Sequence, residues 1–249
     1  MQISSVGIVG HGNFGSFLQA LLERFAPEMQ VKVFSRREKF HEPFYSLEEV
    51  AKCDAVILAV PIHALEDMIQ KIVPLMSEKG ILVDVSTVKK FPAGLLKKYA
   101  KGRNYIATHP MWGPESYKKK SGDVSGFRIV ITDSTLQESD VDEFSRSLET
   151  LGFKVLRMTS DAHDKHLAET LFLTHYIGQI VSRAKFDRTE IDTVSFGYLM
   201  DAVESVKHDK ALFEDVFRFN PYCGKTMLRF EKGESEVGKM LKKAKRGKN

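Results

Sequence analysis

Three segments of the chain carry the side chains best suited to acid–base chemistry. Residues 107–116 hold His109 in a run rich in proline and glycine, and the segment just after an earlier apolar run holds Ser86. A third segment, residues 163–175, ends at His175. A histidine that ionises near neutral pH can act as base or hydrogen-bond partner for an alcohol that loses a hydride. We therefore treat His109 and Ser86 as candidate catalytic residues.

A glycine-rich turn supplies a candidate phosphate site. Residues 10–15 read G-x-G-x-x-G, directly after an apolar run and directly before a helical pattern. In that context Gly10 permits a tight turn, Gly12 lets the backbone approach a pyrophosphate, and Gly15 allows close packing of helix on strand. The free N–H groups of the helix N-terminus favour an anion. The residues assigned to the cofactor here are Gly10, Gly12, Asn13, Phe14 and Gly15.

The end of the second expected strand discriminates between dinucleotides. An NAD site places an acid about 20 residues after the glycines, to bind the ribose 2′-hydroxyl. This chain has Ser35, Arg36 and Arg37 there. A hydroxyl and two guanidiniums suit a 2′-phosphate, so the pattern favours NADP; the alternative is that the arginines are only surface charges. Val60 and Pro61, after the next strand, are also assigned to the cofactor.

The elements that position these residues change in kind near residue 159. Before it, apolar runs alternate with helical spacing, which predicts an α/β, Rossmann-type doubly wound parallel sheet over residues 1–158. After it, helical spacing predicts a smaller all-helical domain over 159–238, its last helix running toward Lys239, then a frayed basic tail over 239–249. The runs expected to form strands are residues 6–9, 31–34, 54–60, 81–85, 105–107, 128–131 and 153–156.

Composition excludes several classes of protein. The chain is 43% hydrophobic and 28% charged, which is typical of a globular protein, and it has no apolar run long enough to cross a membrane. The start lacks the features of a secretory signal, and two distant cysteines suggest free thiols, so we expect a cytoplasmic protein without a metal site. The tail carries six positive charges and no acid, so the net charge of +4 leaves a net charge of −2 for the rest of the chain. A nucleic-acid partner is therefore not expected.

The same segments resemble the prephenate/arogenate dehydrogenase family, across nearly the whole chain. Residues 108–116 are very similar to its T-H-P-M-F-G-P-E-S signature, most of all in the NADP-dependent arogenate branch. Residues 84–89 resemble its D-x-x-S-x-K segment, and residues 163–175 resemble its H-D … H helix. Residues 213–220 resemble the L-F-x-x-L-F-x-Y-N motif of the arogenate branch. Four such segments occur in the family's order.

The resemblance implies a reaction and a set of roles. The reaction is the oxidative decarboxylation of arogenate, prephenate or both in tyrosine biosynthesis, with hydride transfer from ring C4 to NADP⁺ and no metal. His109 would take the proton of the ring 4-hydroxyl, and Ser86 would help to hold that hydroxyl. His175 and Gly113 are assigned to the small-molecule substrate. A homodimer through the helical domain and an active site between the two domains are also implied.

One departure from the family pattern and several alternatives stay open. Prephenate-type members carry T-R-I-A in the helical domain, whereas residues 193–200 here contain no arginine, which favours the arogenate branch. Arg218 or another cation would then bind the substrate carboxylate. His109 and His175 could instead be packing residues, and His163 with Asp164 could simply secure a helix start. The alternative functions are another small NADP-dependent reductase, such as an imine or β-hydroxyacid enzyme, and a non-catalytic dinucleotide sensor.

Overall fold

The chain forms two compact units. The computed structural model describes residues 3–37, 41 and 43–246. The first unit is Met1–His163 and the second is Asp164–Asn249. The boundary expected between residues 158 and 159 falls just before this division, and the expected tail lies inside the second unit.

The first unit is built on a seven-stranded sheet of order β2-β1-β3-β4-β5-β6-β7. The sequence predicted a parallel sheet, and five of the six strand pairings are parallel, but β6 runs antiparallel to β5. The connection between them contains α5 (Pro114–Lys119), which packs on the first helix of the chain instead of crossing the sheet. The next strand therefore returns alongside β5 in the opposite direction. The strands are β1 (Ser5–Val9), β2 (Gln30–Phe34), β3 (Ala55–Leu58), β4 (Ile81–Asp84), β5 (Asn104–Pro110), β6 (Arg128–Ser134) and β7 (Lys154–Arg157).

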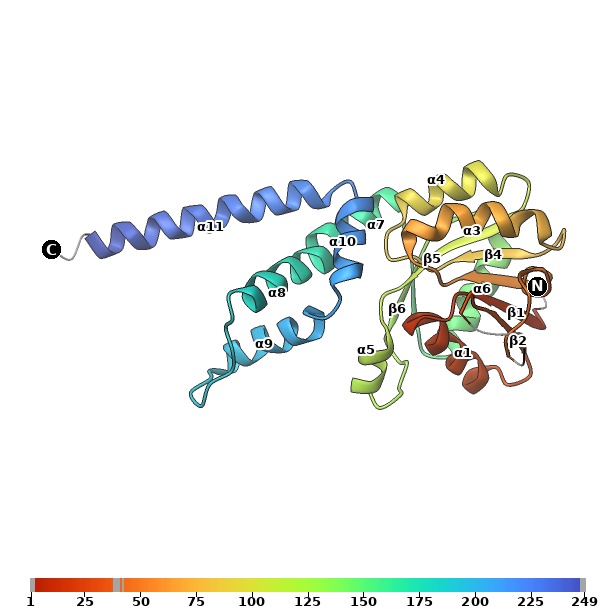
Figure 1. Ribbon diagram of the computed structural model, residues 1–249, viewed down its shortest axis with the longest axis horizontal. Coiled ribbons are helices and arrows are strands. Elements are labelled where there is room, and N and C mark those ends of the chain that lie inside the picture. The colour runs from red at the N-terminus through yellow and green to blue at the C-terminus, as the bar shows by residue number, and fades with distance from the viewer. Residues whose placement is uncertain (1–2, 38–40, 42, 247–249) are drawn as a thin grey trace. The chain divides into compact units, whose positions relative to one another are not determined.

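Helices cover the two faces of this sheet unequally (Figure 1). One face carries α2 (Leu47–Ala51), α3 (Leu65–Ile72) and α4 (Lys90–Tyr99), with two short 3₁₀ turns, η1 (Ile62–Ala64) and η2 (Val73–Leu75). Their apolar side chains form the largest core cluster with Val56, Leu58 and Leu82. The other face carries α1 (Asn13–Phe25) and α6 (Glu138–Thr150). This division follows from right-handed crossovers between strands of this order.

A buried ion pair joins β4 to β5. Lys89 and Asp84 are both fully buried, and Lys89 Nζ lies 2.5 Å from Asp84 Oδ2. Lys89 Nζ also donates to the Thr108 carbonyl oxygen, and Thr108 Oγ1 donates to the Asp84 carbonyl oxygen at 2.9 Å. The carboxyl end of β4 is thus fixed to the strand that carries His109.

The second unit consists of helices. The helix α7 (Ser160–Leu167) spans the division and passes through a π-helical turn, η3 (Ala168–Phe172), into α8 (Leu173–Arg183). The helices α9 (Val194–Val206), α10 (Lys210–Phe219) and α11 (Cys223–Arg246) follow. Phe172 is fully buried and stacks on Phe213 and Phe217 of α10. In the described part of the chain, no helix is long and apolar enough to span a membrane.

The last helix corrects one expectation. It was expected to end near Lys239 and to give way to a frayed tail, but α11 continues to Arg246. Residues 239–246 contain no proline and consist only of lysine, arginine, methionine, leucine and alanine, which are strong helix formers. Local propensity therefore sustains the helix although its side chains are exposed.

Removing one partner of the buried pair should destabilise the first unit strongly. Lys89→Met leaves the Asp84 carboxylate without its counter-charge, which typically costs about 3–5 kcal/mol of unfolding free energy. The matched control is Lys71→Met, because Lys71 pairs with Asp67 at an exposed site and should cost at most about 0.5 kcal/mol. Urea unfolding measures both. Equal losses in the two variants would contradict the assigned role of Lys89.

Candidate functional site

The glycine loop lies where the sheet topology favours a ligand. The chain leaves β1 for β2 on one side and later enters β3 on the other, so the carboxyl end of β1 is a topological switch point. Gly10 has a φ of +106°, and a Cβ on Gly15 would lie 2.0 Å from the Gly10 carbonyl oxygen. A Cβ on Gly12 would meet nothing within 4 Å. No side chain caps α1, which begins at Asn13, so its N-terminal amides remain available to an anion.

The cofactor residues assigned after the next strands lie at the same edge of the sheet. Ser35 follows β2 directly, and Arg36 and Arg37 form an exposed turn in which the Arg37 amide donates to Ser35 Oγ at 3.3 Å. Val60 and Pro61 follow β3, the other neighbour of β1. The turn presents two guanidiniums and one hydroxyl beside the glycine loop. That donor set suits a phosphate group.

His109 is held in β5 by a second histidine. Its Nδ1 lies 2.9 Å from Nε2 of His163 on α7, and both side chains are buried. Burial lowers the pKa of His109 well below its usual value near 6.5, and the charges of His163 and Lys89 lower it further. His109 is therefore neutral at physiological pH, as a general base must be. Sequence reasoning gave His163 only the role of securing a helix start.

Ser86 follows β4 by two residues, and β4 is the parallel neighbour of the strand that carries His109. Asp84 pairs with Ala107 across the two strands, and Ser86 and His109 each lie two residues further along. The Ser86 amide donates to Asp84 Oδ1 at 2.9 Å, whereas Ser86 Oγ is buried without a partner. A buried hydroxyl in that state is available to a ligand.

The D-x-x-S-x-K pattern places its hydroxyl residue at a position other than Ser86, which the sequence analysis did not take into account. Counted from Asp84, the pattern places its hydroxyl at Thr87, one residue after Ser86, and its lysine at Lys89. Thr87 is half-buried in the same turn. The turn after β4 thus offers two hydroxyls, Ser86 and Thr87, and counting the pattern residue by residue would have found the second.

The second unit holds the remaining substrate candidates. His175 on α8 is buried, its Nδ1 has no partner, and its ring stacks on Phe213 with centroids 6.3 Å apart. Burial lowers the pKa of His175, and the charge of Asp209 opposes the shift. Arg218 is exposed on α10. In the first unit Gly113 precedes α5, and a Cβ there would meet nothing within 4 Å.

Metal ligands are not grouped in the described ranges of the chain. No cluster of three or more histidine, cysteine, aspartate or glutamate side chains there has the geometry to hold a metal ion. Both cysteines are buried free thiols.

Two glycine variants separate folding from ligand access. In Gly15→Ala the new methyl group meets the Gly10 carbonyl, so we expect a loss of about 1–3 kcal/mol of unfolding free energy. In Gly12→Ala the methyl group has space, so stability should fall by at most about 1 kcal/mol while dinucleotide affinity drops. Thermal unfolding and fluorescence titration with NADPH measure the two effects. Unchanged affinity in Gly12→Ala would remove this loop from the cofactor site.

Sequence comparisons find related dehydrogenases. The family model described as "Prephenate dehydrogenase, nucleotide-binding domain" matches residues 35–156. The chain is 28% identical to arogenate dehydrogenase 2, chloroplastic, of Arabidopsis thaliana, over 95% of this chain and 69% of that protein.

Two solved structures show the same fold over almost the whole chain. Prephenate dehydrogenase from Aquifex aeolicus, solved with hydroxyphenyl propionate and NAD⁺, has a TM-score of 0.77 at 20% identity and covers 98% of this chain and 92% of its own. Synechocystis arogenate dehydrogenase has a TM-score of 0.68 at 18% identity, with coverages of 97% and 93%. Residues 35–156 therefore belong to the prephenate dehydrogenase nucleotide-binding family, the likeness to an arogenate dehydrogenase extends over 95% of the chain, and the two structures show the same fold.

Proposed function

We propose that the chain catalyses the NADP-dependent oxidative decarboxylation of arogenate, prephenate or both, in tyrosine biosynthesis. The observation that carries the proposal is the buried, neutral His109, held through Nδ1 by His163 at 2.9 Å. A small alcohol that loses a hydride needs a neutral base of this kind. The matched nucleotide-binding family and the likeness to an arogenate dehydrogenase support the choice of reaction.

The proposed chemistry follows from the order of proton and electron movements. Nε2 of His109 accepts the proton of the ring 4-hydroxyl, while Ser86 or Thr87 holds that hydroxyl in place. Bound NADP⁺ supplies the acceptor for the hydride from ring C4. The ring carboxylate leaves as CO₂, and its bonding electrons complete the aromatic ring. The neutral state of His109 permits the first of these steps, since a protonated imidazole accepts no proton.

The choice between arogenate and prephenate is the more specific part of the proposal. The helix α9 contains no arginine or lysine, so the arginine that binds a carboxylate in prephenate-type members has no counterpart there. We favour arogenate for that reason. The exposed Arg218 remains our candidate for a substrate carboxylate.

Absorbance at 340 nm with NADP⁺ tests the reaction, with arogenate and prephenate offered separately. We expect reduction with arogenate, and a loss of at least about 10²–10⁴-fold in kcat for His109→Asn at unchanged NADPH affinity. The matched control is His166→Asn, because His166 is exposed on α7. Because the pKa of His109 is lowered, the rate should decline with acidity only below pH 6.5. Turnover of a β-hydroxyacid but of neither cyclohexadiene would contradict the proposal.

The turn after β2 supports NADP as the cofactor. Arg36→Asp places a negative charge where a 2′-phosphate would bind, so affinity for NADPH should fall about 10- to 100-fold while affinity for NADH stays within about twofold. Arg146→Asp, an exposed change on α6, is the charge-matched control. Fluorescence titration with both nucleotides gives the ratio. An equal loss of affinity for NADPH and for NADH would show that Arg36 does not bind the 2′-phosphate.

We also propose a homodimer that forms through the second unit. Large apolar side chains are exposed on its helices and connecting loops, which is typical of an association surface. Tyr198→Asp on α9 should shift the molecule from dimer to monomer in sedimentation velocity, whereas Leu156→Asp in the first unit should not. A wild-type monomer would contradict the proposal. The exposed residues are Ile180, Phe186, Ile191, Val194, Tyr198, Leu199, Phe217, Leu228, Val237, Met240 and Leu241.

The proposed location is a reducing compartment, namely the cytoplasm. Both cysteines, Cys53 and Cys223, are buried free thiols, which fits reducing conditions. Fractionation of the source cells tests this, and recovery from an organelle would overturn it.

A further inference from the structure

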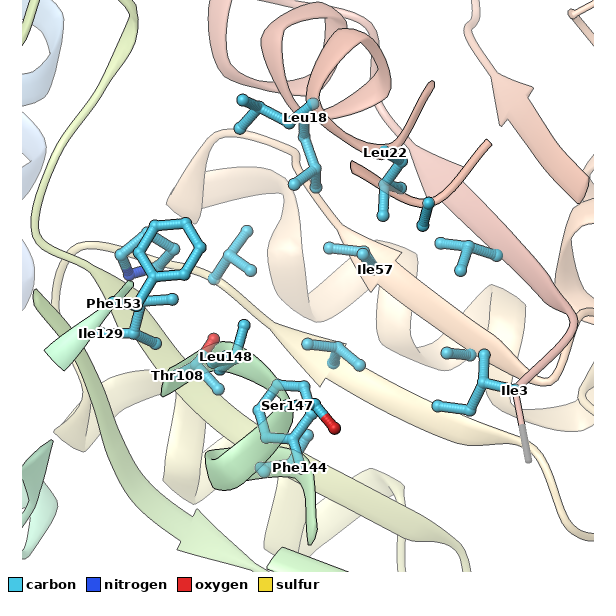
Figure 2. A pocket seen from close by; sticks show the side chains of 18 of the residues that line it. Ile3, Leu18, Leu22, Ile57, Thr108, Ile129, Phe144, Ser147, Leu148 and Phe153 are labelled. Carbon is cyan, nitrogen blue, oxygen red and sulfur yellow. The ribbon is translucent and has the colours of Figure 1, made fainter. Parts of the chain in front are cut away.

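The strand β5 turns the ring of His109 toward α7. Its neighbour Thr108 lines the apolar cavity between α1 and α6 on the other face of the sheet (Figure 2). Successive side chains of a strand point to opposite faces, so His109 points away from that cavity. There it contacts His163 of α7, which belongs to the same compact unit. The two rings therefore form a pair within the first unit.

The geometry of the pair permits a proton to pass from one ring to the other. Nδ1 of His109 lies 2.9 Å from Nε2 of His163, and the ring centroids are 5.1 Å apart. At that distance one nitrogen donates a proton and the other accepts it. His109 is only 5% exposed and His163 only 3%. Because both rings are so deeply buried, bulk water has little access to the two nitrogens of this contact.

The surroundings of His109 disfavour a positive charge that stays on its ring. Burial lowers the pKa of His109, and the charges of His163 and Lys89 lower it further. The carboxylate of Asp84 is bound to Lys89 Nζ at 2.5 Å and accepts the Ser86 amide, so its charge is already balanced. When His109 accepts a proton at Nε2, the loss of its Nδ1 proton to a neighbour makes the ring neutral again.

A histidine partner differs in its chemistry from the aspartate of a serine-protease triad. That aspartate accepts the Nδ1–H of the catalytic histidine and stabilises the imidazolium by its negative charge, without taking the proton. A neutral imidazole in the same place supplies no negative charge. It can itself take up a proton, because an imidazole ionises close to neutral pH. His163 is therefore suited to receive the proton of His109.

We propose that His163 is a temporary proton acceptor for His109, which stores a proton while the substrate is oxidised. This inference rests on the proposed function. The O–H bond of the ring 4-hydroxyl breaks as Nε2 of His109 gains that proton. The Nδ1–H bond of His109 breaks as Nε2 of His163 gains the second proton. The hydride of ring C4 leaves with both electrons for the nicotinamide of NADP⁺.

The loss of CO₂ reverses the proton movements. The bonding electrons of the carboxylate complete the aromatic ring and place a negative charge on the ring oxygen. Nε2 of His109 returns a proton to that oxygen, and Nε2 of His163 returns the stored proton to Nδ1 of His109. Both histidines are then neutral, and the pair is ready for the next substrate without exchange of a proton with water.

The variant His163→Gln separates storage of the proton from orientation of the base. The amide oxygen of glutamine can accept the Nδ1–H of His109 but takes up no proton. We expect kcat with NADP⁺ to fall about 10- to 100-fold, while KM and NADPH affinity stay within about twofold. The matched control is His166→Gln, an exposed change on the same helix that should leave kcat unchanged. A wild-type kcat in His163→Gln would overturn the proposal.

Single-turnover rates in mixtures of H₂O and D₂O count the protons that move, and the wild-type chain alone suffices for this test. Two moving protons give a curved dependence of the rate on the deuterium fraction, and one gives a straight line. We expect a curve for the wild type and a straight line for His163→Gln. A straight line for the wild type would contradict proton storage on His163.

Nuclear magnetic resonance tests the pair without turnover. Because the charge of His163 lowers the pKa of His109, the first proton added to the pair on acidification should lie on His163. The ¹⁵N shifts of the labelled free protein report which ring is charged, and a first proton on His109 would overturn the proposal. Failure of the wild type to oxidise arogenate and prephenate would instead contradict the proposed function, whatever the spectra show for the pair.

Discussion

The ion pair between Lys89 and Asp84 is the interaction on which the arrangement of the candidate site depends. Both side chains are fully buried, so each requires the other for charge balance. Lys89 also donates to the Thr108 carbonyl oxygen, one residue before His109. The turn that carries Ser86 begins at Asp84. The Ser86 amide donates a hydrogen bond to the Asp84 carboxylate. One buried pair thus holds the two strand ends that carry the proposed base and the proposed hydroxyl.

The same pair sets the electrostatics of His109. A cation buried close to an imidazole disfavours a second positive charge, so Lys89 adds to the effects of burial and of His163 in lowering the pKa of His109. His163 contributes geometry as well, because its contact with Nδ1 fixes the ring. Nε2 of His109 then remains for a ligand. Structural charge balance and the proposed base catalysis therefore rest on the same few side chains.

The sequence predicted the parts of this molecule that depend on local pattern. Apolar runs placed the strands, and the spacing of Gly10, Gly12 and Gly15 placed the turn at the switch point. Tertiary contacts decided the rest. The reversal of β6 depends on α5 packing against α1, and the role of His163 depends on a contact across 54 residues.

The position of one proton tests the central claim most directly. If His109 acts as the base, its Nδ1 carries the proton and donates to His163 Nε2, which leaves Nε2 of His109 free to accept. Long-range ¹H–¹⁵N correlation spectra of the labelled protein, assigned with His109→Asn, report the tautomer and its titration. We predict a neutral ring with Nδ1–H that persists below pH 6.5. A ring protonated at Nε2, or one that is cationic at neutral pH, would contradict the assignment of His109 as the base.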